Sequence, residues 1–132
     1  MRKYLAPLAV VAAAAGLVAV PLEAARLSGE ERLAKLIEGR TAGEARDCIP
    51  TSANQSFTVL DKTAIVYKQG RRVWVNRTKN PRDLDDDDIM VVRKFGSSNL
   101  CRTDMITMID RASGMFSGAV FLEDFVPYEK AI

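Results

Sequence analysis

The chain lacks histidine altogether and has only two cysteines among its 132 residues. Histidine is the commonest general base and metal ligand, so its absence argues against histidine-activated nucleophiles and histidine-bound metals. Two cysteines are too few for a four-thiolate zinc site. An excess of one charge is also missing, since 19 Lys and Arg face 17 Asp and Glu, which excludes a protein that merely coats polyanions. These absences favour a non-catalytic protein without a cofactor.

What the chain does have is an apolar N-terminal end. Arg2 and Lys3 precede a nearly unbroken run of Leu, Ala and Val from Leu5 to Val20, which Pro21 ends. This pattern is typical of a secretory signal peptide, so we expect residues 1–25 to be removed and the protein to be periplasmic or secreted. The alternative is an uncleaved membrane anchor, because the 18 residues from Leu5 to Leu22 are just long enough to cross about 30 Å of hydrocarbon.

Beyond residue 25 there is no second apolar span, so we expect no transmembrane segment after cleavage. Ser28 and Glu31 form a capping box that predicts a short helix. Its apolar stripe is Leu33, Leu36 and Ile37. Thr41 repeats the capping pattern and predicts a second helix of at most two turns, ended by Pro50. We therefore expect a short helical segment over residues 26–50 and a small β domain over residues 51–132.

The β domain is predicted from alternating and β-branched segments separated by turn residues. The expected strands lie at residues 57–59, 64–67, 73–75, 89–92, 105–109, 115–122 and 125–128. Gly70 and Gly114 lie in two of the expected hairpin turns. The predicted fold class is mainly β: a small antiparallel β-barrel or sandwich of about five to seven strands, with a short N-terminal helix after the signal peptide.

The two cysteines are consistent with export. In an oxidising compartment an isolated pair forms a disulfide, so we expect a bond between Cys48 and Cys101. A redox pair is the alternative, but the spacing is not C-x-x-C and no neighbouring residue indicates a lowered thiol pKa.

The strongest functional signal is a basic hairpin without an acidic residue in it. Its cations are Lys62, Lys68, Arg71, Arg72, Arg77, Lys79 and Arg82. We expect Val73 and Val75 to face the core, which would leave Trp74 outward beside Arg72. The candidate anionic-ligand residues are Lys68, Arg71, Arg72, Trp74 and Arg77. Because an exported protein seldom meets nucleic acid, an anionic envelope lipid or glycan, or an envelope protein, is the expected partner.

An acidic loop follows the basic hairpin directly. Asp83, Asp85 and Asp87 fit positions one, three and five of a calcium loop, which makes them weak metal candidates. Positions six and twelve are Asp88 and Lys94, where that loop needs glycine and glutamate, so the match fails. The alternative is a solvated loop that neutralises the basic hairpin across the surface.

Two further functions are open. Asp104 and Asp110 flank a predicted strand and would have to converge in a carboxylate-based hydrolase, yet six residues of strand separate them by about 20 Å. Turn roles are the expected alternative for both. A secreted inhibitor of a hydrolase, with a projecting loop that blocks the enzyme's cleft, is the other candidate.

Several short segments resemble those of a known group of proteins. They are residues 48–50, 75–77, 84–89, 100–101, 104 and 125–128. On these segments the chain resembles a family of small, exported, uncharacterised alphaproteobacterial proteins, a domain of unknown function. The resemblance implies export and a common fold, and it implies no activity or catalytic residues.

The first prediction concerns the N-terminus. If residues 1–25 are a cleaved signal peptide, protein recovered from the cell envelope should begin close to Arg26. Intact-mass measurement of that material tests this. Recovery of membrane-bound protein that retains Met1 would favour the anchor and contradict the prediction.

Overall fold

The computed structural model describes residues 26–51, 57–93 and 98–131, together with Gly16. The predicted signal peptide lies outside the described residues except for Gly16. No helix within them is long and apolar enough to cross a membrane.

The described part of the chain is mainly β, as predicted. It contains the helix α1 (Gly29–Ile37), the short 3-10 helix η1 (Pro81–Asp83) and ten strands. The strands are β1 (Arg40–Ala42), β2 (Cys48–Pro50), β3 (Phe57–Leu60), β4 (Ala64–Gln69), β5 (Arg72–Asn76), β6 (Ile89–Val92), β7 (Asn99–Cys101), β8 (Met105–Ile109), β9 (Phe116–Phe121) and β10 (Val126–Lys130). Ten short strands exceed the five to seven expected, chiefly because three-residue strands carry no periodicity of their own.

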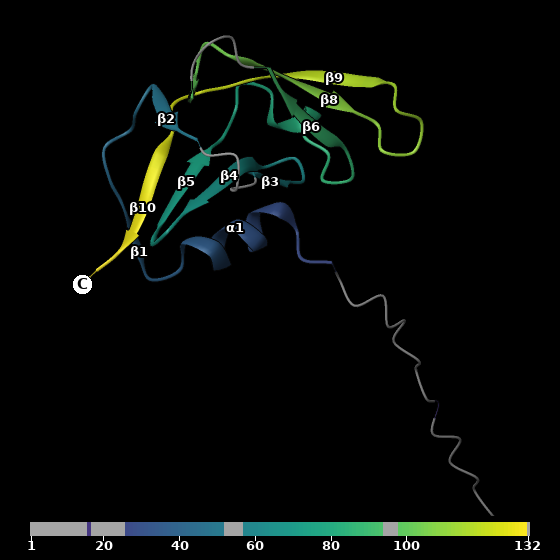
Figure 1. Ribbon diagram of the computed structural model, residues 1–132. Coiled ribbons are helices and arrows are strands. Elements are labelled where there is room, and N and C mark those ends of the chain that lie inside the picture. The colour runs from purple at the N-terminus through teal and green to yellow at the C-terminus, as the bar shows by residue number, and fades with distance from the viewer. Residues whose placement is uncertain (1–15, 17–25, 52–56, 94–97, 132) are drawn as a thin grey trace, which may run out of the picture.

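The strands form three antiparallel sheets. The largest has the order β1-β10-β5-β4-β3, a second has the order β6-β8-β9, and β2 pairs with β7. In Figure 1, α1 lies below the five-stranded sheet and the three-stranded sheet lies above it. The described strands do not close into a barrel, so the sandwich is the better description of the two alternatives.

Helix α1 begins where its capping box predicts. The backbone N–H of Glu31 donates to Ser28 Oγ at 3.2 Å, which caps the first turn. Leu33 is buried against the sheet. Gly29 lies so close to the turn after β3 that a Cβ there would come within 2.2 Å of the Asp61 carbonyl oxygen. Glycine is therefore required where the helix meets this turn.

The second helix predicted after Thr41 is wrong. Residues 40–42 form β1, which pairs with β10 at the edge of the large sheet, and residues 48–50 form β2. Arg40 fixes the turn into β1, because its Nε donates to the Leu36 carbonyl at 3.1 Å and its Nη1 donates to the Arg71 carbonyl. A two-turn helix is marginal in water, so pairing with an existing sheet edge prevails.

The five-stranded sheet is buried on both faces along β4 and β5. One core lies between it and α1 and contains Leu33, Leu60, Ala64, Val66, Val73 and Val75. The larger core lies on the opposite face, beneath the other two sheets. It contains Ile49, Ile65, Tyr67, Trp74, Leu84, Leu100, Ile106, Met108, Val120, Leu122 and Phe125.

The prediction that Trp74 faces outward is therefore wrong. Val73 and Val75 face a core as expected, but that core is the one under α1. Trp74 faces the other way into the larger core and is only 1% exposed. Its Nε1 donates to Gln69 Oε1 at 3.1 Å, which satisfies the indole N–H. Alternation correctly separated the two faces but did not show that both are covered.

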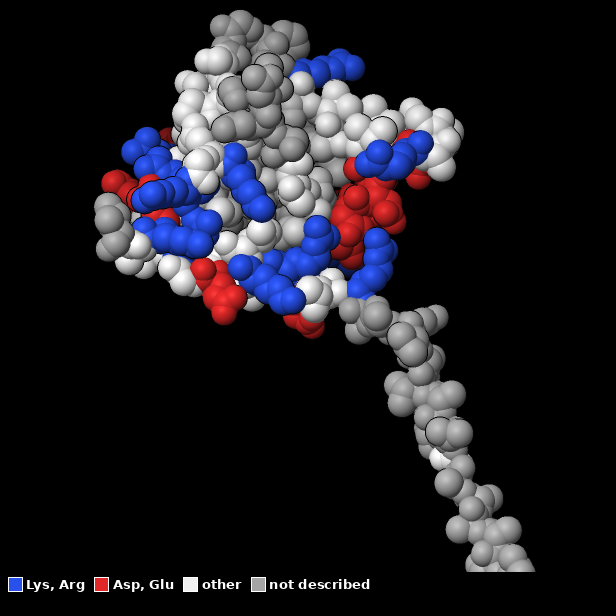
Figure 2. Space-filling view, turned by 60° about the horizontal axis from the view of Figure 1, so that its bottom comes forward, with Lys and Arg blue, Asp and Glu red and all other residues white. Residues whose placement is uncertain are grey.

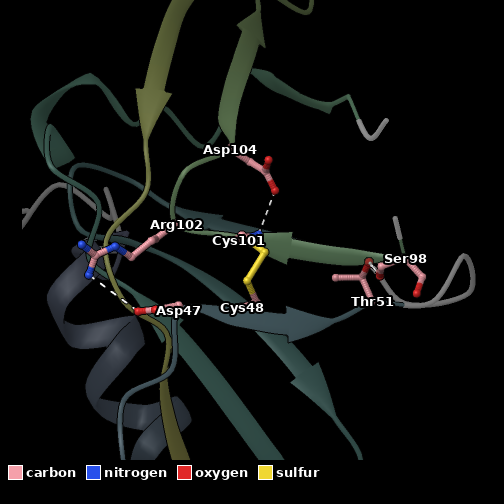
Figure 3. Close-up of a disulfide and its surroundings, with 7 residues drawn as sticks. All are labelled: Asp47, Cys48, Thr51, Ser98, Cys101, Arg102 and Asp104. Carbon is pink, nitrogen blue, oxygen red and sulfur yellow. Dashed lines mark hydrogen bonds and ion pairs between the residues drawn. A yellow bond between two sulfur atoms is a disulfide. The ribbon is translucent and has the colours of Figure 1, made fainter. Parts of the chain in front are cut away.

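The disulfide between Cys48 and Cys101 is present. The two residues are directly opposite each other on β2 and β7, and their separation in sequence is 53 residues. Figure 3 shows polar contacts around the bond: Asp104 Oδ2 accepts from the Cys101 N–H at 2.8 Å, and Thr51 Oγ1 donates to the Ser98 carbonyl at 2.7 Å. The bond thus connects β2, which follows β1 of the large sheet, to β7, which precedes β8.

Removal of this bond should destabilise the fold. On the chain-entropy model a closed loop of this length is worth about 4 kcal/mol, so Cys101→Ser should lower the free energy of unfolding by about 2–5 kcal/mol. Urea unfolding followed by the fluorescence of the single tryptophan, Trp74, measures the change. Reduced wild-type protein should match the variant, and a loss below about 0.5 kcal/mol would show that the bond is dispensable.

Candidate functional site

The five predicted anionic-ligand residues do not form one site. Lys68, Arg71 and Arg77 are exposed at the ends of β4 and β5, whereas Arg72 is half-buried and Trp74 is buried. Arg72 forms an ion pair with Glu129 across the β5–β10 pair, and its guanidinium carbon lies 5.2 Å from the Trp74 ring centroid. Arg72 and Trp74 therefore stabilise the sheet and are not free for a ligand.

Arg77 and Arg71 also have contacts within the protein. Arg77 Nη1 lies 2.7 Å from Glu30 Oε1, an exposed ion pair that joins β5 to α1. The Arg71 carbonyl accepts the hydrogen bond from Arg40, and Arg71 is exposed in the turn between β4 and β5. Of the five candidates, Lys68 lies in a hollow of the surface.

That hollow is formed by α1 and the sheet together. It measures about 360 Å³ and is lined by Arg32, Lys35, Leu36, Thr58 and Lys68, without a carboxylate among these residues. Figure 2 views the molecule from the α1 side and shows Lys and Arg side chains predominating over this face. The cations of α1 were not predicted as ligand residues, because nothing in the sequence indicates which side of the sheet the helix covers. We call Arg32, Lys35 and Lys68 the cationic hollow.

The acidic loop does not neutralise the basic hairpin in the described structure. Asp86 instead pairs with Arg32 of α1 at 3.2 Å. Asp88 is buried and accepts from Ser117 Oγ at 2.6 Å, so it belongs to the three-stranded sheet. Arg111 Nε donates to the Asp87 carbonyl at 3.1 Å. The loop is thus tied to α1 and to the β8–β9 hairpin, which leaves Lys68 without a described carboxylate partner.

The predicted metal candidates Asp83, Asp85 and Asp87 are not brought together. Asp83 accepts from Asn80 Nδ2 at 2.9 Å, and the Asp87 N–H donates to Asp85 Oδ1 at 2.9 Å. The described residues instead place carboxylate oxygens of Asp61, Asp85 and Asp86 within 4.8 Å of one another. Asp61 lies in the turn after β3. It is so far from the acidic loop in the sequence that no local motif predicts their proximity.

A larger groove opens beside this acidic group. It has a volume of about 1320 Å³ and runs between β3 and β6. Its walls are apolar where the strands face it, at Phe57, Val59, Met90 and Val92. Its charged lining residues are Arg26, Arg32, Asp61, Asp86, Asp88 and Arg111. The sequence contains no signal for this groove, because it depends on how two sheets are placed relative to each other.

Asp104 and Asp110 have the turn roles expected for them and lie at opposite ends of β8. Asp104 accepts from the Cys101 N–H. Asp110 Oδ1 accepts from the backbone N–H groups of Ser113 and Ala112 and from the Ser113 hydroxyl. These hydrogen bonds, that of the Ser113 N–H foremost, hold the pKa of Asp110 below its ordinary value. The geometry does not bring the two carboxylates together for hydrolysis.

Comparisons of the chain with protein-family models, with curated proteins and with solved structures find no match.

The turn at Asp110 gives a pH-dependent prediction. Because its pKa is lowered in the folded protein, Asp110 stabilises the fold above the pKa of the unfolded chain, and this stabilisation is lost as pH falls through the folded pKa. Carboxyl ¹³C titration should therefore give Asp110 a lower midpoint in the wild type than in Ser113→Ala. In Ser117→Ala, which removes the hydrogen bond to Asp88, the Asp110 midpoint should not move. Equal midpoints in wild type and Ser113→Ala would contradict the assignment.

Proposed function

We propose that this protein is exported and binds an anionic component of the cell envelope, a lipid or a glycan, through the cationic hollow and without catalysis. The observation that carries the proposal is the convergence of Arg32, Lys35 and Lys68 around one hollow that no described carboxylate lines. Of the basic hairpin predicted from the sequence, only Lys68 lines this hollow, and α1 supplies the other two cations.

The arrangement suits an anion for electrostatic reasons. Arg32 and Lys35 are three residues apart on α1 and so lie on the same side of the helix, and Lys68 of β4 lines the same hollow. Like charges around one hollow repel one another, and a bound phosphate, sulfate or carboxylate would relieve that repulsion. Asp86 offsets only the charge of Arg32. Leu36 and Thr58 supply an apolar surface and a hydroxyl at the same place.

A non-catalytic role is supported by how the acidic residues are used. Asp104 and Asp110 hold turns, and Asp88 is buried with Ser117 as its hydrogen-bond donor. With no histidine in the chain, the described serines have no imidazole to activate them. Export is supported by the disulfide between Cys48 and Cys101, a bond that persists in oxidising compartments.

A second candidate, a secreted inhibitor of a hydrolase, has one observation in its favour. The β8–β9 hairpin projects from the body of the protein in Figure 1. Met115 and Phe116, at the start of its returning strand, are each 69% exposed. Exposed apolar side chains on a projecting loop suit insertion into a partner's cleft. Capture of one envelope hydrolase by the wild type and not by Phe116→Ser would favour this candidate.

The main proposal predicts binding to anionic vesicles. Exported protein should cosediment with vesicles of phosphatidylglycerol in phosphatidylcholine or be retained on heparin, and binding should weaken steeply with salt because exposed charges are screened within about 10 Å. Lys35→Glu/Lys68→Glu should reduce affinity more than about tenfold, since each cation near an anionic surface contributes about 1 kcal/mol.

The matched control is Lys79→Glu/Lys130→Glu, which changes net charge equally at exposed positions that do not line the hollow. This variant should keep most of the binding. Vesicle binding without heparin retention would identify the lipid class, and the reverse would identify the glycan class. Failure to bind either probe at low salt, or equal losses in the two double variants, would refute the proposal.

A further inference from the structure

Two sheet edges are left open toward the same groove. In the described structure β3 pairs only with β4, and β6 pairs only with β8, so each strand has a free edge. Both strands contribute side chains to the groove of about 1320 Å³. Neither carries a charged residue or a proline, since their sequences are FTVL and IMVV. Charge and proline are the usual protection of an exposed edge, and both of these edges lack it.

The groove also exposes part of the main core. Phe57, Val59, Met90 and Val92 pack against the core cluster but are only partly buried, and all four line the groove. On the five-stranded sheet Phe57 is stacked on Tyr67, with ring centroids 4.7 Å apart. An apolar wall next to strand edges that have no partner among the described strands is the surface that an added β-strand requires.

One end of the groove is negatively charged. Asp61 directly follows β3, and its carboxylate lies with those of Asp85 and Asp86 within a 4.8 Å group. Arg32 pairs with Asp86, and Arg26 and Arg111 are the other cations that line the groove. No hydrogen bond or ion pair to the Asp61 carboxylate exists among the described residues. A further positive charge would therefore be stabilised at this end.

We propose that this groove binds an extended peptide as an additional strand, antiparallel to β3, with a basic residue at the peptide's N-terminal end beside Asp61. The direction follows from the chain: β3 runs from Phe57 to Leu60 toward Asp61, so the N-terminal end of an antiparallel partner lies next to that carboxylate. Alternate apolar side chains of the peptide cover Phe57 and Val59. The groove shares Arg32 and Thr58 with the cationic hollow but is not lined by Lys35 or Lys68. The inference therefore does not depend on the proposed function, which is tested at those two lysines.

The test uses synthetic peptides and exported, disulfide-bonded protein. The probe is a fluorescent hexapeptide of alternating valine and threonine with arginine at its N-terminal end, and anisotropy measures its Kd. Binding should weaken about three- to tenfold when the arginine is moved to the C-terminal end or replaced by norleucine. N-methylation of alternate peptide amides on the edge that meets β3 should reduce affinity more than about tenfold, because those amides donate to the strand.

Variants of the protein separate the charge from the strand pairing. Asp61→Asn should weaken the arginine peptide about three- to tenfold and leave the norleucine peptide unchanged. Glu44→Gln, an exposed carboxylate outside the groove, should affect neither peptide. Lys35→Glu/Lys68→Glu should also leave peptide binding intact, so failure here and failure of anion binding are distinguishable.

Hydrogen exchange gives an independent measurement. Amides of β3 that face away from β4 should exchange freely in the protein alone and become protected when peptide is added. Protection of those amides in the free monomer would show that the edge is already occupied and would overturn the proposal. So would protection that arises from self-association in the absence of peptide, or binding that tolerates N-methylation of both sets of alternate amides.

Discussion

The structure depends on burying the β4–β5 hairpin from both sides. The residues from Ala64 to Tyr67 and from Val73 to Asn76 are all buried, so successive side chains face two different cores. The helix α1 covers one face, and the two smaller sheets cover the other. A strand buried on both faces cannot present charged side chains along its length, because an unpaired buried charge is costly. The cations of the hairpin are therefore confined to its ends and its turn.

This confinement shapes the surface electrostatics. Arg72 remains near Trp74 but is neutralised by Glu129, while Lys68, at the end of β4, joins Arg32 and Lys35 above α1. Acidic residues are gathered on the side of the β3–β6 groove, where Asp61 meets Asp85 and Asp86. A chain of small net charge thus carries a cationic hollow and an acidic groove end, and Arg32 belongs to both.

The sandwich is joined on one side and open on the other. The disulfide and the β2–β7 pair connect the large sheet to β8, and the N–H of Arg46 donates to the Phe125 carbonyl at 2.8 Å beside that connection. Between β3 and β6 the described strands form no such connection, and the apolar side chains there stay partly exposed. Apolar surface next to unpaired strand edges gains free energy when it is covered, which gives the groove its capacity to bind.

Local patterns in the sequence determined the helix cap at Ser28, the turn at Gly70, the faces of β5 and the cysteine pairing. Each rests on spacing or chemistry within a few residues, or on there being only one way to pair two cysteines. Only the tertiary structure decided that Trp74 is buried and that residues 40–42 and 48–50 are strands. It also decided that two cations of α1 line the same hollow as Lys68, and that Asp61 faces the acidic loop. These outcomes depend on which element covers each sheet face and on which edge remains free. Both depend on contacts between residues that are far apart in the chain, and a local sequence pattern cannot indicate such contacts.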